Sequence, residues 1–301
     1  MDTTTSPMPA SPPASRVWAR DVASLFKLRI GFMIMLTALV GVAFVPNAAP
    51  GGMTVVALAL AVLLSSAAAG GFNQYYERNE DSRMARTRSR PFVTGALRAG
   101  PEWLGVFALL LAASFALATW AVNVHSAVHT LLGGLFYGFV YTVWLKRRSA
   151  WNIVIGGASG SFAVLAGAAA VDPSIGPLGW ILAAVLFLWT PPHFWALAIA
   201  NKDDYAAAGV PMLPVVTGIA RAARIVFWST LALVGVSLLP IAFGAGWLYF
   251  AGAFTGGAHF LLHSWRLAVA PTRQRAMSAF FASLIQLTLL LAAAALDPLF
   301  R

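Results

Sequence analysis

Long uncharged segments alternate with short charged ones along the chain. The uncharged segments run over 30–76, 103–145, 149–201 (which carries only Asp172), 225–265 and 276–296. Turn-forming clusters at 46–52, 123–126, 172–177 and 244–246 divide each of the first four into two. The resulting pieces are close to the ~20 residues that a helix needs to cross a bilayer. The pattern therefore predicts an all-α integral membrane protein with nine transmembrane helices.

Composition supports this class. The 301 residues are 59% hydrophobic and only 10% charged, with a net charge of +10, whereas about a quarter of a soluble domain is charged. The basic residues occupy short loops and do not form a patch, so we expect no nucleic-acid partner. All basic residues except Arg301 fall on one side of the predicted topology. The positive-inside rule then places the amino terminus in the cytoplasm and the carboxy terminus outside.

The amino-terminal segment and the missing cysteines narrow the picture further. Residues 1–15 are rich in Pro, Ser and Thr, which predicts a disordered tail, and they lack the order of a cleaved signal peptide. We expect the remainder, 16–301, to form one membrane domain. Because the chain has no cysteine, thiolate nucleophiles and zinc–thiolate sites are excluded. A metal ion would have to bind oxygen or imidazole ligands.

The first polar constellation follows the second predicted span. Asn73, Glu77 and Asp81 recur every four residues, so they share one face if the helix continues past the membrane interface. Two carboxylates at this spacing repel one another. A divalent cation bound between them makes the arrangement favourable. Magnesium is typically held by one or two carboxylates together with phosphate oxygens. The spacing therefore indicates a site for a magnesium-bound diphosphate.

A plainer interpretation of the same stretch stays open. The polar residues can form a solvated helix end in which Asp81 pairs with Arg78 and Glu80 lies near Arg83. The arginines that follow can be topology signals or can grip phosphate through two parallel hydrogen bonds; they are Arg83, Arg86, Arg88 and Arg90.

The second constellation occupies 187–205, at the end of the sixth predicted span. Pro191 and Pro192 remove backbone donors inside the membrane, which is tolerated where the backbone lines a cavity or packs on protein. His193 is a candidate for ligand contact, or it bonds a carbonyl that the prolines leave free. His193 and Asp204 are eleven residues apart, so they lie on one face if the helix is regular.

The acids at the end of this span also have two interpretations. Asp203 and Asp204 can form a second metal-binding pair that faces Glu77 and Asp81, or they can be plain interfacial acids. A further pair, His259 and His263, is spaced for metal or haem ligation but lacks the carboxylate of an H-E-x-x-H motif, and a pocket-lining role is the alternative.

Five motifs together resemble a known family. They are N-x-x-x-E-R-x-x-D-x-x-M-x-R-T-x-x-R-P at 73–91, Y-T-x-x-L-K-R at 141–147, W-N-I-V-I-G-G at 151–157, T-P-P-H-F-W-A-L-A at 190–198 and D-Y-x-x-A-G-V-P-M-L-P-V at 204–215. The set resembles the UbiA-type intramembrane prenyltransferases. R-T-x-x-R-P and T-P-P-H are the segments that resemble the haem-modifying branch of that family.

The resemblance implies nine helices around a central cavity, in a bacterial inner membrane. It implies transfer of a farnesyl group from farnesyl diphosphate to a vinyl group of haem B, with Mg²⁺ as the cofactor. The implied partners are membrane lipid and the proteins that would receive the product, which are haem A synthase or terminal oxidase assembly partners. The implied magnesium-diphosphate residues are Asn73, Glu77 and Asp81 on one side and Asp204 on the other. The implied substrate-binding residues are Arg86, Arg90, Lys146 and Lys202 for the diphosphate and His193 for the haem.

Two other functions fit parts of the pattern. A prenyltransferase of the same fold could use a quinone precursor or a chlorin as the acceptor. A transporter of an anionic substrate would also need basic residues and broken helices. The acids, however, lie at one membrane edge and no ion relay is visible at the midplane, which favours the enzyme.

Overall fold

A computed structural model describes residues 14–46 and 50–300, and every regular element in these two ranges is helical. Residues 1–13 of the predicted tail and Arg301 lie outside the described residues. The α-helices are α1 (Ala14–Leu25), α2 (Leu28–Phe44), α3 (Gly52–Asp81), α4 (Pro91–Thr94), α5 (Glu102–Ala121), α6 (Val124–Leu135), α7 (Asn152–Gly156), α8 (Ala158–Val171), α9 (Gly176–Ala200), α10 (Lys202–Ala207), α11 (Leu213–Thr217), α12 (Ile219–Leu238), α13 (Trp247–Val269) and α14 (Arg273–Leu296). A π-helix, η1 (Phe136–Leu145), continues α6, and two 3-10 turns, η2 (Leu239–Phe243) and η3 (Asp297–Phe300), follow α12 and α14.

Seven helical segments of the described chain are long and apolar enough to cross a membrane, and a bent pair, Trp18–Leu25 with Leu28–Phe44, gives an eighth. The prediction of an all-α integral membrane protein is therefore confirmed. The predicted count of nine is not confirmed, because α13 is not among these segments. It spans 23 residues in the predicted place but carries His259 and His263, which lower its hydropathy.

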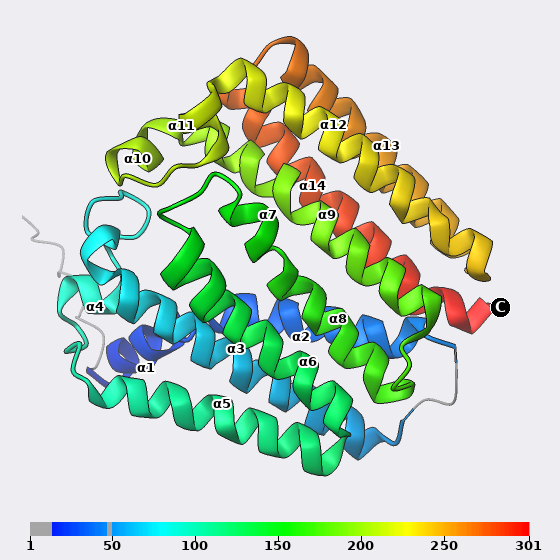
Figure 1. Ribbon diagram of the computed structural model, residues 1–301, viewed down its shortest axis with the longest axis horizontal. Helices are drawn as coiled ribbons and strands as arrows, with labels where there is room; N and C mark the ends of the chain where they lie inside the picture. The colour runs from blue at the N-terminus through cyan, green and yellow to red at the C-terminus, as the bar shows by residue number, and fades with distance from the viewer. Residues whose placement is uncertain (1–13, 47–49, 301) are drawn as a thin grey trace, which may run out of the picture.

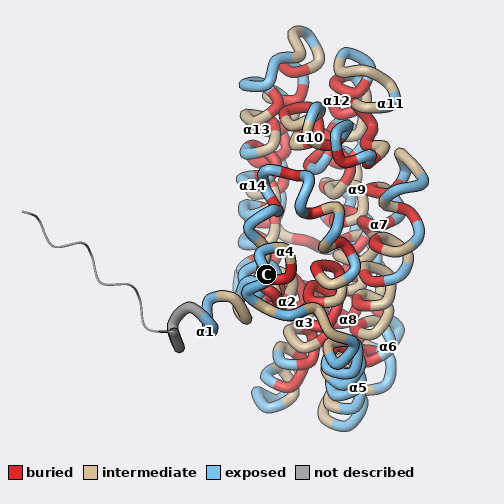
Figure 2. The backbone as a smooth tube through the Cα atoms, turned by 90° about the vertical axis from the view of Figure 1, so that its left-hand side faces the viewer, coloured by how far each residue is buried: buried red, intermediate tan, exposed pale blue. Residues whose placement is uncertain are grey.

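The helices lie side by side, with α5 at one edge of the bundle and α13 at the other (Figure 1). Of the residues in the most apolar stretch of each helix, 17% are buried in α5, compared with 56% in α9 and 61% in the segment that holds α8. Burial is therefore greatest in the middle of the bundle, and Figure 2 shows the outer helix α5 mostly exposed. The loops that follow α3, η1 and α9, which hold most of the candidate site, gather along one edge of the molecule (Figure 1).

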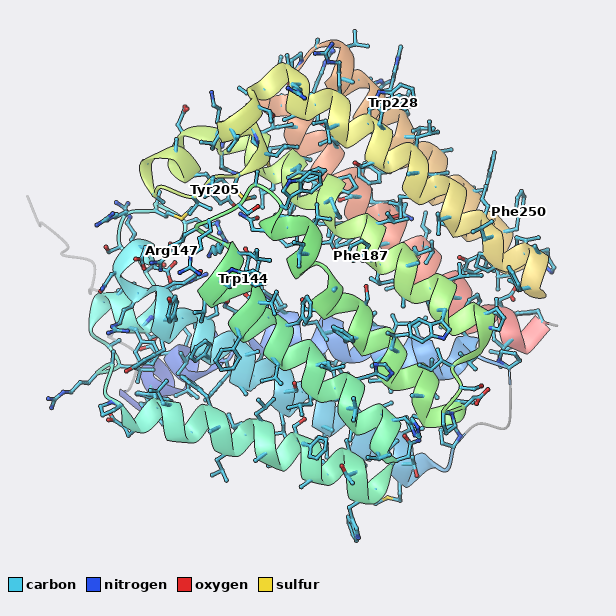
Figure 3. The ribbon with its side chains drawn as sticks, in the orientation of Figure 1. Trp144, Arg147, Phe187, Tyr205, Trp228 and Phe250 are labelled. Atoms are coloured by element: carbon cyan, nitrogen blue, oxygen red, sulfur yellow. The ribbon has the colours of Figure 1, made fainter. Side chains whose placement is uncertain are left out.

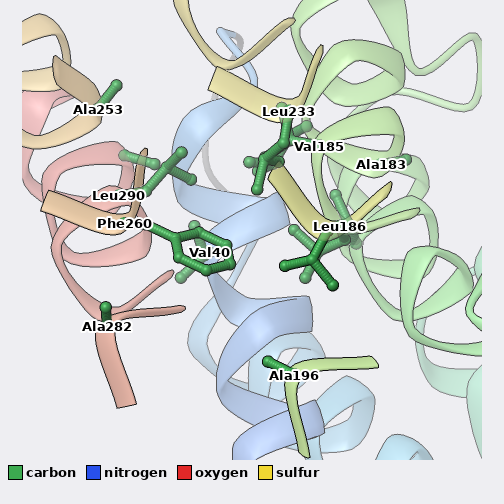
Figure 4. Packing of buried hydrophobic residues seen from close by; sticks show 14 of the residues in the cluster. Val40, Ala183, Val185, Leu186, Ala196, Leu233, Ala253, Phe260, Ala282 and Leu290 are labelled. Carbon is green, nitrogen blue, oxygen red and sulfur yellow. The ribbon is translucent and has the colours of Figure 1, made fainter. Parts of the chain in front are cut away.

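Helix α9 is central to the packing. It contacts α8, α12 and α14, and its Leu182, Val185 and Leu186 belong to a large buried cluster. Val40 from α2 and Phe260 from α13, both labelled in Figure 4, belong to this cluster. The ring of Phe44 on α2 also stacks on that of Tyr249 on α13 at 4.9 Å between centroids, so the cluster joins the two ends of the chain. The carboxy-terminal helices thus pack onto the element that carries the second polar constellation.

Helices α2 and α8 approach each other closely because small residues lie at their contact. A Cβ atom at Gly167 would clash with the carbonyl oxygen of Ala38, and one at Gly41 would clash with that of Val164. Small residues of this kind allow membrane helices to pack backbone against backbone. The contact fixes α2, and with it the break before α2 that borders the candidate site.

Candidate active site

Helix α3 is one continuous helix of 30 residues that ends at Asp81. The helix therefore runs unbroken through Asn73, Glu77 and Asp81, which is the condition for these residues to share one face. Asn73, Glu77 and Asp81 are each only 2–3% exposed, so the polar stripe faces protein rather than solvent. A fully solvated helix end is therefore the wrong description of this stripe.

Two basic side chains from other elements compensate the buried carboxylates. The Nζ atom of Lys146 lies 2.5 Å from the Glu77 carboxylate. Arg90 forms an ion pair with Asp81, and its Nη1 atom lies 4.0 Å from Glu77 Oε2. These cations relieve the repulsion between two acids one turn apart, as buried charges require.

The pairings of the plainer interpretation are not the ones formed. Asp81 pairs with Arg90 rather than Arg78, whose Nη1 donates to the carbonyl oxygen of Tyr75. Glu80 pairs with Arg147 at 2.7 Å. The reason is that α3 ends at Asp81 and the following turns bring Arg90 back to the buried face, while η1 ends beside Glu80.

The π-helix η1 presents two residues to this stripe. Asn73 donates from Nδ2 to Thr142 Oγ1 at 3.0 Å, and Thr142 Oγ1 donates to the carbonyl oxygen of Tyr137 at 2.8 Å. Lys146, at the end of η1, donates its backbone N–H to the carbonyl oxygen of Tyr141, five residues earlier. Insertions of this wider helical geometry are frequent at functional sites, and here the π-helix places Thr142 and Lys146 against α3.

Lys27 completes the cluster, although it was not among the predicted site residues. It lies between α1 and α2 with φ 49° and ψ 41°, in the left-handed region. Its Nζ donates to Asn73 Oδ1 at 2.6 Å and to the Tyr137 hydroxyl at 3.1 Å. A non-glycine residue rarely adopts this backbone conformation, so only the fold reveals that the break turns Lys27 toward Asn73.

The second constellation is arranged differently from its prediction. Helix α9 ends at Ala200, Asn201 has φ −123° and ψ 34°, and α10 starts afresh at Lys202. The Asn201 side chain bonds the carbonyl oxygen of Leu197 at 2.9 Å. The prediction of one regular face from His193 to Asp204 is therefore wrong, because the helix breaks at Asn201.

The acids of α10 lie in an open setting. Asp203 is exposed and Asp204 is half-buried, and neither forms an ion pair with any residue in the described ranges. Lys202 is also half-buried and has no carboxylate partner in this part of the chain. The placement of Asp204 and Lys202 against a bound diphosphate stays a prediction.

A small apolar cluster joins the two constellations. Met84, just after α3, packs with Tyr205, Ala208 and Met212 of the α10–α11 region, and Figure 3 shows Tyr205 and Arg147 on the same edge of the molecule. Burial raises the pKa of the Tyr205 hydroxyl, and the neighbouring Arg86 guanidinium opposes this rise. The negative charges of Asp204 and Glu77 also raise the pKa of this hydroxyl, so carboxylates of both motifs lie near Tyr205.

Of the four arginines that follow α3, one pairs with a carboxylate and three are exposed without a carboxylate partner in the described chain. Arg90 is the only member of the group that pairs with a carboxylate in the described chain. Arg83, Arg86 and Arg88 are exposed. Of these, Arg86 lies beside Tyr205, which places its guanidinium between the two motifs. Its predicted role in diphosphate binding is not tested by these contacts.

His193 lies in an aromatic box, not against a free carbonyl. Its ring stacks on Trp189 at 4.2 Å and on Phe280 at 4.6 Å between centroids. Its Nδ1 is 2.6 Å from the hydroxyl of Ser283 on α14. The interpretation that His193 bonds a carbonyl freed by the prolines is therefore wrong, and its contact with haem stays a prediction.

The other histidine pair gives no metal site. The rings of His259 and His263 lie 4.6 Å apart, yet within the described residues no three His, Asp or Glu side chains cluster closely enough to hold a metal ion. Two surface hollows, one beside Met53 and Trp120 and one beside Asp172 and Phe243, also lie away from the α3 stripe. The predicted central cavity stays a prediction.

The residues nevertheless suit a magnesium–diphosphate complex. Glu77 and Asp81 offer hard oxygen donors on one face, and Asn73 adds an amide oxygen. Magnesium uses one or two carboxylates and takes its remaining ligands from water and phosphate, so a preformed cluster of three protein acids is not needed. The cations that now neutralise the acids, Lys146 and Arg90, are themselves phosphate-binding groups.

Comparisons with known proteins agree with this geometry. The UbiA prenyltransferase family matches residues 34–285. The chain is 59% identical over 279 residues to protoheme IX farnesyltransferase 2 of Paramagnetospirillum magneticum, covering 92% of this chain and 96% of that protein. It is 48% identical over 282 residues to protoheme IX farnesyltransferase 1 of the same organism, with 92% and 98% covered.

Solved structures show the same fold. A digeranylgeranylglyceryl phosphate synthase superposes with a TM-score of 0.78 at 17% identity, covering 94% of this chain and 99% of that one. A UbiA homologue from Archaeoglobus fulgidus bound to DMAPP and Mg²⁺ superposes with a TM-score of 0.71 at 17% identity, with 90% and 99% covered. The family match and the close relatives settle the assignment: this chain belongs to the UbiA prenyltransferase family.

Proposed function

We propose that this protein transfers the farnesyl group of farnesyl diphosphate to a vinyl group of protohaem IX, which gives haem O and releases diphosphate. The sequence identity of 59% over nearly the whole length of a protoheme IX farnesyltransferase supports the acceptor. The buried, cation-compensated stripe of Asn73, Glu77 and Asp81 supports the diphosphate chemistry. The stripe is the observation that carries the proposed mechanism.

The leaving group determines what the residues must do. The C1–O bond of farnesyl diphosphate breaks with its electron pair going to oxygen, so negative charge grows on the diphosphate. Mg²⁺ held by Glu77 and Asp81 would neutralise part of that charge as a Lewis acid. Lys146 and Arg90 already point at these carboxylates. With Glu77 and Asp81 engaged as metal ligands, Lys146 and Arg90 would be free to bind the phosphate oxygens, where they would stabilise the developing charge.

The second motif would close the site from the opposite side. Asp204 and Lys202 at the start of α10 and Arg86 beside Tyr205 are not committed to ion pairs in the described chain. They are therefore available to a magnesium–diphosphate complex without the loss of an ion pair in that part of the chain. We assign Asp204 to the metal and Arg86 and Lys202 to the diphosphate.

The remaining steps need no protein nucleophile. The farnesyl cation bonds to the vinyl carbon of haem, and water adds to the resulting cation and loses a proton, which gives the hydroxyethylfarnesyl group. The bundle must keep water from the first cation, and its interior of apolar side chains suits that requirement.

We further propose that the edge carrying the site faces the cytoplasm of a bacterial inner membrane, because nearly all the basic residues lie in its loops. The chain has no cysteine, so single cysteines introduced at Arg88 and at Ser174 report the two sides. A membrane-impermeant thiol reagent added to intact cells should label only the second; the reverse result would invert the topology.

The decisive experiment supplies membranes containing the protein with protohaem IX and farnesyl diphosphate, with and without Mg²⁺. Haem O should form only with the divalent cation present. Unchanged haem in the complete reaction would sink the proposed function. A parallel reaction with 4-hydroxybenzoate tests the quinone-precursor acceptor, and uptake of labelled farnesyl diphosphate into vesicles without any product tests the transporter.

A further inference from the structure

Ser283 on α14 is the polar partner of His193 on α9. The two side chains are buried, Ser283 completely, and Ser283 Oγ lies 2.6 Å from His193 Nδ1 across 90 residues of sequence. Helices α9 and α14 run side by side in Figure 1 and contact each other along their length. The bond therefore ties the carboxy-terminal helix to the histidine of the second constellation.

The direction of this hydrogen bond follows from the other contact of the serine. Ser283 Oγ donates to the carbonyl oxygen of Phe280 at 2.6 Å. A hydroxyl group has one hydrogen, so while Ser283 donates it to Phe280, the same oxygen can only accept from His193. In this arrangement Nδ1 of His193 carries the proton. No acidic side chain in the described ranges pairs with His193, and an unpaired buried charge is costly, so the ring is neutral and its lone pair is on Nε2.

The ring is also fixed in orientation. Trp189 and Phe280 stack on its two faces with interplanar angles of 19° and 27°. Trp189 Nε1 donates to the backbone carbonyl oxygen of Ser283 at 2.9 Å, so the same residue anchors both His193 and one wall of the box. Nε2 makes no hydrogen bond with any residue of the described chain, which leaves its lone pair available to a ligand.

We propose that Ser283 is a positioning residue that holds His193 in the Nδ1–H tautomer and so presents Nε2 to the iron of the haem substrate. This inference rests on the proposed function. A neutral imidazole nitrogen is a common ligand of haem iron. Histidines that bind metals typically donate their second nitrogen to a fixed acceptor, which sets the tautomer and strengthens the ligand. Ser283 supplies that acceptor here.

The test uses the full-length protein purified in detergent and titrated with ferric protohaem IX, with absorbance spectra and affinity as readouts. The wild type should show an imidazole-ligated spectrum. His193→Ala should lose it and regain it with added imidazole. Ser283→Ala should weaken haem affinity by about 10- to 100-fold, the usual effect of removing such a partner. Farnesyl diphosphate affinity should be unchanged in both variants, which shows that they are folded.

Ser264 provides the matched control. It is fully buried on α13 and donates to the carbonyl oxygen of Leu261 at 2.9 Å, but it bonds no histidine. Ser264→Ala should leave the haem spectrum and affinity unchanged. If Ser283→Ala leaves the haem spectrum and affinity unchanged, as expected for Ser264→Ala, then Ser283 does not position His193 and the inference is wrong. If His193→Ala keeps the wild-type spectrum while haem O still forms, the inference fails and the proposed function stands; a wild type that binds no haem would overturn both.

Discussion

The two acidic motifs of this protein lie at the same edge but in opposite states. Glu77 and Asp81 are buried in a long helix and each is held by a cation from another element. Asp203 and Asp204 lie on a six-residue helix after a break, are more exposed, and form no ion pair within the described chain. One motif is assembled and neutralised in advance, whereas the other is open.

This difference indicates a division of labour. Buried carboxylates need compensation by charge before any substrate arrives, and the groups that provide it, Lys146 and Arg90, suit the diphosphate itself. The open acids need no such compensation and can respond to a ligand. A magnesium–diphosphate complex would exchange partners in the first motif and recruit side chains in the second. The comparison predicts that mutations in the first motif lower the melting temperature, whereas mutations in the second do not.

The largest effect should come from Asp81→Asn. It removes a metal ligand and leaves the partly buried Arg90 without its partner, so we expect kcat to fall by about 10²–10³-fold and the melting temperature in detergent to drop. Haem O formation in membranes and a thermal unfolding assay measure the two effects. Glu80→Gln is the control, because its partner Arg147 is exposed and such pairs contribute about 0–1 kcal/mol. Similar behaviour of the two variants would contradict the proposed role of the buried stripe.

The contrast also separates what the sequence could predict from what it could not. The uncharged segments and their turns predicted the helices, and the four-residue spacing predicted that Asn73, Glu77 and Asp81 share a face. These are periodic, local signals. The ion pair of Glu77 joins residues that are 69 positions apart, and no local pattern specifies such a partner.

Backbone geometry explains the remaining misses. Lys27 reaches Asn73 because its own φ is 49°, a conformation that nothing in the residue type requires. The break at Asn201 lies where the uncharged segment 149–201 ends, and no proline or glycine at this point signals that the helix stops. The π-helix that ends at Leu145 likewise has no simple sequence signal. Each of these depends on tertiary contacts that override local preference.

A smaller total effect is expected for Asp204→Asn. Turnover should fall by about 100-fold, since a metal-binding charge is lost where the leaving group develops its own, but the melting temperature should not change because no ion pair in the described chain is broken. Asp203→Asn, at the exposed neighbour, is the matched control and should retain activity. Loss of stability in the Asp204 variant together with normal turnover would show that the second motif is a structural cap.

The smallest effect is expected for Thr142→Val, which tests how the first motif is held together. Thr142→Val removes the acceptor of the Asn73 side-chain amide at a site where both residues are buried. A buried donor left unpaired costs about 1–3 kcal/mol, so we expect a lower melting temperature and a several-fold rise in the KM for farnesyl diphosphate, with kcat nearly unchanged. Thr142→Ser keeps the hydroxyl and should behave as the wild type. Equal stability of the Val and Ser variants would mean that the π-helix holds Asn73 by packing alone, and the first motif would then be less preassembled than its hydrogen bonds indicate.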